Sequence, residues 1–132
     1  MKSARFNRVF AWQKAHKFVL ATYRFSSSFP ATERYGLTTQ LRRAAVSIPA
    51  NFVEGFRRSS LAEKVRFYNI AQASGEEARY YLILAADLGY GDPASISAIL
   101  DEALSLLEGY TCALRKKLEK QNLHREVTGA MK

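Results

Sequence analysis

The segment YGLTTQLRRAAVSIPANFVEG, residues 35–55, carries two opposite stripes of side chains at helical spacing and one internal proline. Its apolar residues recur at steps of three and four, which places them on one face of an α-helix. This apolar stripe continues one residue beyond the segment and consists of Leu41, Ala44, Ala45, Ile48, Phe52 and Phe56. The segment therefore predicts an amphipathic helix that buries one face in a core.

The other face of this helix carries a polar row, which consists of Gln40, Arg43, Ser47, Asn51 and Glu54. A solvated helix face is typically filled with Lys, Glu and Ala, so this row indicates a face with partners. Arg43 and Glu54 lie about 16 Å apart along the helix axis, so each needs a partner on another helix, another subunit or a ligand. For Ser47 and Asn51 we favour a structural role near the proline over contact with a ligand, since buried amides are mostly structural.

The proline of this segment, Pro49, lacks a backbone donor and crowds the carbonyl of Ala45. The apolar spacing does not slip across Pro49, so we expect a second helix that is kinked there and continues. We expect Thr38 or Thr39 to be its N-cap. A first helix is expected over residues 10–27, where apolar residues recur at helical steps.

Two further helices are expected from their end signals. Ser60 with Glu63 forms a capping box that opens the third helix, and Gly89 ends it. Asp92 followed by Pro93 is a strong start for the fourth. Short connections between four amphipathic helices predict an all-α, antiparallel up-down-up-down four-helix bundle.

The length of 132 residues suits one domain. We expect residues 1–120 to form the bundle and residues 121–132 to form a polar, disordered tail. No apolar run approaches the ~18 residues of a membrane span, and the N-terminal segment does not resemble a signal peptide. A cytoplasmic protein without membrane contact is therefore expected.

The net charge of +8 is unevenly distributed. Residues 1–58 hold eleven Lys and Arg against two acidic residues, whereas residues 59–132 hold nine against ten. A one-sided positive field attracts phosphate backbones. The alternative is an ordinary solvated face of a basic protein. The candidate nucleic-acid-binding residues are Lys14, Lys17, Arg24, Arg42, Arg43, Arg57 and Arg58.

Catalytic and cofactor motifs are missing from the sequence. Its two histidines and one cysteine are too few for a zinc site, and neither His16 nor His124 follows a Glu at the spacing of a di-iron bundle. No phosphate-binding glycine motif is present. We therefore expect no enzyme activity, no metal and no cofactor.

Three separated motifs carry a resemblance to a known family: VFAWQKAHKF (residues 9–18), RYGLTTQLRRAAVSIPANFVEGFRR (residues 34–58) and DLGY (residues 87–90). In this order they resemble the small four-helix-bundle proteins encoded in intervening sequences of bacterial large-subunit ribosomal RNA genes. Accessory proteins of diversity-generating retroelements are distant relatives of that family. The resemblance covers roughly residues 6–118 and implies a homopentamer.

Three positions depart from the family as a whole. Val53 stands where Ala is typical, Gly75 where a large apolar residue is typical, and Arg79 where Glu is typical. The change at Arg79 removes one of a pair of acidic residues, so a role that depends on that pair is not expected here.

Together these features predict a non-enzymatic, oligomeric bundle that binds RNA or DNA backbone through a basic surface. The resemblance implies an accessory role beside a reverse transcriptase or an RNA-processing partner. The alternative function is a protein-protein interaction scaffold without nucleic-acid binding. Clustering of the candidate cations on one exposed surface would favour nucleic acid, and burial of Arg42 or Arg43 between subunits would favour the scaffold.

Overall fold

The computed structural model describes residues 5–130 and contains no strand in that range. The four helices are α1 (Phe10–Ser26), α2 (Leu37–Arg57), α3 (Leu61–Asp87) and α4 (Ala94–Ala130). Two single turns of 3₁₀-helix, η1 (Phe6–Arg8) and η2 (Ala31–Glu33), precede α1 and α2. The predicted all-α four-helix bundle is confirmed.

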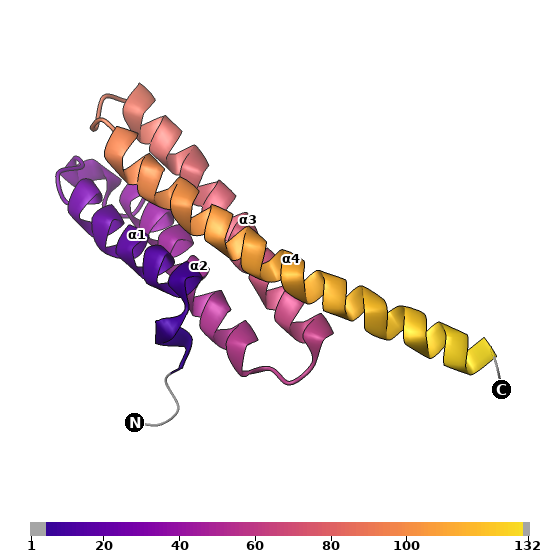
Figure 1. The fold of residues 1–132 in the computed structure, drawn as a ribbon. Helices are drawn as coiled ribbons and strands as arrows, with labels where there is room; N and C mark the ends of the chain where they lie inside the picture. Colours follow the sequence, from indigo (N-terminus) through magenta and orange to yellow (C-terminus); the bar gives the residue numbers. More distant parts are fainter. Residues whose placement is uncertain (1–4, 131–132) are drawn as a thin grey trace.

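The helices pack in a closed set, because α1 and α3 each contact both α2 and α4. The connections from α1 to α2 and from α3 to α4 lie at one end of the bundle, and the connection from α2 to α3 lies at the other (Figure 1). The core between the helices holds the largest fully buried side chains, which are Tyr68, Phe18, Phe52, Leu41, Ile48, Leu82 and Leu100.

Helix α2 runs unbroken through Pro49, as the continuous apolar spacing predicts. The apolar stripe is buried except at Phe56, which packs half-buried against the core. Pro49 is itself buried. The proline therefore lies within a helix whose stability comes from tertiary packing. The kink at Pro49 stays a prediction.

The ends of α3 and the start of α4 follow their sequence signals. The Ser60 hydroxyl accepts a hydrogen bond from the Glu63 amide at 3.0 Å, and Gly89 has a positive φ of 77°. The Asp92 carboxylate accepts from the amide of Ala94 at 3.0 Å. Short polar side chains and one glycine thus satisfy backbone groups at these helix ends.

The start of α2 differs from the prediction, since α2 begins at Leu37 and its N-cap is Gly36. The carboxylate of Glu33 accepts from the Leu37 amide at 3.2 Å. A Cβ on Gly36 would lie 2.8 Å from Glu33 Oε1, so the glycine makes room for this carboxylate. A negative charge at a helix N-terminus is favourable, and it replaces the expected cap by Thr38 or Thr39.

The end of α4 also differs from the prediction. We expected disorder over residues 121–132, but α4 continues as helix to Ala130 and projects beyond the other helices (Figure 1). Residues 121–130 are all exposed. They hold no proline, and five of the ten are good helix formers: Gln121, Leu123, Arg125, Glu126 and Ala130. The helix extends into them from the packed part of α4, so no new helix has to be nucleated. Residues 131–132 lie outside the described residues. Neither α4 nor another helix within residues 5–130 is long and apolar enough to cross a membrane.

Helices α3 and α4 approach closely at Gly75. A Cβ on Gly75 would lie 2.3 Å from Leu104 Cδ2, and Leu104 is buried. Leu104 thus occupies the space next to the position where the resemblance implies a large apolar side chain. This departure from the family pattern has a packing explanation.

Candidate nucleic-acid interface

The seven candidate cations on α1 and α2 differ in whether a carboxylate neutralises them. Lys14 Nζ lies 3.2 Å from Glu102 on α4, and Arg58 lies 3.3 Å from Glu54 one turn earlier on α2. The remaining five have no acidic partner within residues 5–130. They are Lys17, Arg24, Arg42, Arg43 and Arg57.

The cations on α3 and on α4 up to Arg115 differ from these five, because each has a hydrogen-bond or ion-pair partner. Lys64 donates to backbone carbonyls. The arginines pair with carboxylates: Arg66 with Glu63, Arg79 with Glu76 and Asp101, and Arg115 with Glu108. Unneutralised charge therefore lies on α1 and α2, and again on α4 beyond Arg115, where Lys116, Lys117, Lys120 and Arg125 are exposed.

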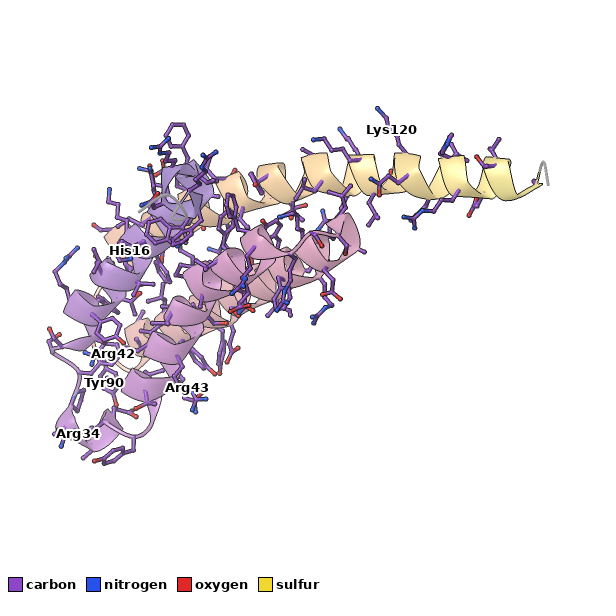
Figure 2. All side chains as sticks on the ribbon, turned by 90° about the horizontal axis from the view of Figure 1, so that it is seen from below. His16, Arg34, Arg42, Arg43, Tyr90 and Lys120 are labelled. Carbon is purple, nitrogen blue, oxygen red and sulfur yellow. The ribbon has the colours of Figure 1, made fainter. Side chains whose placement is uncertain are left out.

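The five unpaired cations do not form one surface, so the clustering that would favour nucleic acid over a scaffold is not found among them. Lys17 and Arg24 are exposed on α1, seven residues apart and so on one face. Arg42 and Arg43 lie near the start of α2, at the end of the bundle that also holds Arg34 and Tyr90 (Figure 2). Arg57 ends α2, about 22 Å further along its axis. The sequence pattern therefore identified the positively charged residues, but it did not predict that they lie in three separate groups.

Arg42 is held in place by α1. Its guanidinium carbon lies 4.5 Å from the centre of the Tyr23 ring, a cation–π contact. Its Nε donates to the Ser26 hydroxyl at 2.8 Å, and one terminal nitrogen donates to the Tyr23 carbonyl at 3.3 Å. A guanidinium has five N–H donors, so three stay available after these two bonds. Arg42 is a pre-ordered cation with spare donors.

A cleft of about 470 Å³ opens beside Arg42 between α1 and α2, and we call it the Arg42–Arg43 cleft. Its lining combines two guanidinium groups, two hydroxyls, an aromatic ring and a branched apolar side chain. These residues are Tyr23, Thr39, Arg42, Arg43, Val46 and Ser47. Tyr23 and Val46 are 44% and 40% exposed, so the apolar side of the cleft is open to solvent. The cleft offers positive charge next to an apolar wall.

The polar row divides between structural and exposed members. Ser47 Oγ lies 2.8 Å from Ser74 Oγ on α3. The Asn51 amide donates to the Ser47 carbonyl and to Ser47 Oγ, both at 2.8 Å. Asn51 thus supports the helix near Pro49 through the carbonyl of Ser47, and not through the carbonyl of Ala45 that the proline leaves free.

The other three members of the polar row are exposed: Gln40, Arg43 and Glu54. Gln40 and Arg43 line a second, more polar cleft between α2 and α3, together with Ser47, Ser74 and Glu77. Arg43 therefore stands between two clefts, while Glu54 is engaged with Arg58.

Two groups near opposite ends of α2 have shifted pKa values: the Tyr90 hydroxyl and the Lys64 ammonium. The Tyr90 hydroxyl donates to Glu33 Oε2 at 2.8 Å, and this hydrogen bond raises the pKa of Tyr90 above its ordinary value. It ties the α3–α4 connection to the carboxylate that caps α2. At the other end of α2, Lys64 donates to the Phe56 carbonyl at 2.6 Å, and burial lowers the pKa of its ammonium. Lys64 therefore caps carbonyls in the last turn of α2.

The projecting part of α4 carries cations that the analysis of charge by halves missed, and Lys120 among them stands away from the bundle (Figure 2). Residues 111–130 hold five Lys and Arg against two Glu. A count over a shorter window gives the signal, which Asp92 and the acidic residues in the first half of α4 hide in a sum over the second half. The exposed cations here are Lys116, Lys117, Lys120 and Arg125.

No group of three or more His, Cys, Asp or Glu side chains within residues 5–130 is arranged to hold a metal ion. His16 stacks on the Trp12 ring at 5.1 Å between ring centres. This contact assigns the histidine to packing on α1.

The molecule is a basic four-helix bundle with unneutralised charge on its first two helices. It belongs to the 23S rRNA-intervening sequence protein family, which matches residues 7–109. The resemblance read from the three sequence motifs is therefore confirmed. No curated protein matches the chain.

Among solved structures, one that is similar to this chain has a TM-score of 0.68. It is the crystal structure of a protein with unknown function from the S23 ribosomal protein family of Bacteroides thetaiotaomicron. The two chains are 24% identical, and the match covers 76% of this chain and 97% of that chain. This similarity shows that the two proteins share a fold.

Proposed function

We propose that this protein binds the phosphate backbone of RNA or DNA without catalysing a reaction. The observation that carries the proposal is a pairing asymmetry: the cations on α3 and on α4 up to Arg115 have partners, whereas five on α1 and α2 have no carboxylate within residues 5–130. Beyond Arg115, exposed cations of α4 add to the unpaired charge. A cation already paired with a carboxylate must lose that contact to bind a phosphate. An unpaired, exposed cation releases only counterions.

Membership of a family named for 23S rRNA intervening sequences supports nucleic acid as the partner. We further propose an accessory role in the cytoplasm beside an RNA-processing enzyme or a reverse transcriptase, as the resemblance of the sequence motifs implies; that partner would supply the chemistry. No base-reading motif is present, so the proposed binding is weakly dependent on sequence.

The test compares two double variants that remove the same charge. Lys17→Gln with Arg24→Gln removes two unpaired cations from α1, and Arg66→Gln with Arg115→Gln removes two paired ones. Filter binding to a generic RNA at several salt concentrations is the measurement. We expect the first variant to reduce the salt slope by about 1.5, since each lost phosphate contact removes ~0.7–0.9. Equal slopes for the two variants, or no binding by the wild type at low salt, would contradict the proposal.

A scaffold built from copies of this chain is the second candidate, and one observation favours it. The projecting end of α4 exposes Leu123 and Val127, which are 61% and 52% accessible and lie one turn apart on the same face. We propose that this face contacts another subunit. The family resemblance supports five subunits. An oligomer would also repeat the basic groups and strengthen binding to a long nucleic acid.

A further inference from the structure

We infer that the Arg42–Arg43 cleft binds one nucleotide unit of a single-stranded nucleic acid, with the phosphate on the two arginines and the base against Tyr23 and Val46. The inference rests on the proposed function and deepens it. It distinguishes one site among the three groups of unpaired cations, and it selects single strands over duplexes.

The phosphate half of the site follows from the two guanidinium groups. Arg42 is fixed over Tyr23 by three contacts and keeps three donors free. Arg43 is adjacent in sequence, lines the same cleft and has no hydrogen bond or ion pair within residues 5–130. Guanidinium groups bind phosphate oxygens through charge-assisted hydrogen bonds, often in pairs. Pre-ordering of Arg42 lowers the entropy lost on binding.

The position of the nucleoside in the proposed site is inferred from the apolar wall of the cleft. Tyr23 and Val46 leave an apolar surface open next to the cations. The hydroxyls of Thr39 and Ser47 also line the cleft, and both are already hydrogen-bonded within the protein. The cleft volume of about 470 Å³ lies in the range of small-ligand sites. Proteins that bind single strands combine cations for the backbone with aromatic or apolar surfaces for the bases. The other two groups of unpaired cations have no such cleft beside them among the described pockets.

Strand selectivity follows from access to the bases. In a duplex the bases are paired and stacked, so only phosphate and sugar can reach the cleft. An unpaired strand can turn a base against Tyr23 while its phosphate stays on Arg43. The apolar wall therefore adds affinity only for single strands.

The experiment measures fluorescence anisotropy with labelled oligouridine and oligothymidine of about 15 nucleotides, and with a blunt duplex of the same length. Arg43→Gln tests the phosphate contact, and the matched control is Lys17→Gln, another exposed and unpaired cation. We expect Arg43→Gln to weaken single-strand binding about tenfold or more, as loss of a charged hydrogen bond does. The expected loss for duplex is no larger than that caused by Lys17→Gln. Arg43 makes no contact that holds the fold, so its thermal unfolding curve should match the wild type.

A second variant tests the wall without changing charge. Tyr23→Ser should lower the preference for single strands over duplex, whereas Tyr80→Ser, which removes an exposed tyrosine from α3, should not. Equal wild-type affinity for single strands and duplex, with Arg43→Gln no weaker than Lys17→Gln, would overturn this inference and leave the proposed function intact. Absence of any nucleic-acid binding would overturn both. Free uridine monophosphate that competes as well as the oligonucleotide would overturn the choice of a strand as ligand.

Discussion

Asn51 shows that a polar side chain on an outer helix face can serve its own helix. Its amide reaches back one turn to the carbonyl and hydroxyl of Ser47, and Ser47 in turn contacts Ser74 on α3. The chain of bonds joins α2 to α3 next to Pro49. The polar-row residues on either side of these hydrogen bonds, Gln40 and Glu54, are exposed.

Replacing Asn51 with leucine should destabilise the protein by about 1 kcal/mol, the net value of a typical hydrogen bond. The Ser47 carbonyl remains part of the α2 backbone in this variant, so a larger loss of unfolding free energy is not expected. Urea unfolding followed by circular dichroism measures the change, and Gln40→Leu is the control because it makes the same kind of replacement at an exposed site of α2. An unchanged unfolding free energy in Asn51→Leu, combined with lost partner binding, would instead assign Asn51 to the interface.

At the scale of helices, the closest approach of α3 to α4 depends on the pair Gly75 and Leu104. The methyl group in Gly75→Ala would meet Leu104 Cδ2, and Leu104 is buried at 3% exposure, so it has little room to move. Overpacking of this kind costs about 1–3 kcal/mol, whereas alanine is favoured over glycine within a helix by ~1 kcal/mol. We expect a net loss of about 1 kcal/mol in the single variant.

The effect of Gly75→Ala on stability should change sign in a Leu104→Ala background. Truncation of Leu104 removes the atoms that the new methyl group would meet, so Gly75→Ala should then stabilise the protein by about 1 kcal/mol through helix propensity. Chemical unfolding of the four chains of this double-mutant cycle gives the coupling between the two positions. If Gly75→Ala changes stability in the same direction in the wild-type and the Leu104→Ala backgrounds, steric overlap with Leu104 does not determine its effect.

The starts of α3 and α4 could be predicted because their caps lie within three residues of the helix they open, as Ser60 and Asp92 do. The start of α2 could not, since Glu33 reaches its amide across Gly36 and competes with two nearby threonines. The extension of α4 was missed because polarity was read as disorder, although helix propensity does not require an apolar face.

For the whole molecule, the sequence predicted the excess of positive charge in the first half, but it predicted neither the exposed cations of α4 nor where the charge gathers. Arg42 turns toward α1 because Tyr23 and Ser26 lie there, and Lys14 turns toward α4 because Glu102 lies there. Both contacts join residues far apart in the sequence. A helical stripe predicts which side chains share one face, whereas the partners of that face depend on how the helices pack.

The projecting end of α4 leads to a prediction about assembly. Residues 121–130 are exposed and pack against no other helix, so this end of α4 gains no stability from tertiary packing. A contact between subunits through Leu123 and Val127 would supply that support. We expect light scattering at micromolar concentration to give a mass of about five times the 14.9 kDa of one chain. The double variant Leu123→Ser with Val127→Ser should shift the mass toward the monomer, and Ile83→Ser, at an exposed apolar site of α3, should not. A wild-type mass near 14.9 kDa would contradict the assembly, and a double variant with the wild-type mass would place the contact elsewhere on the bundle.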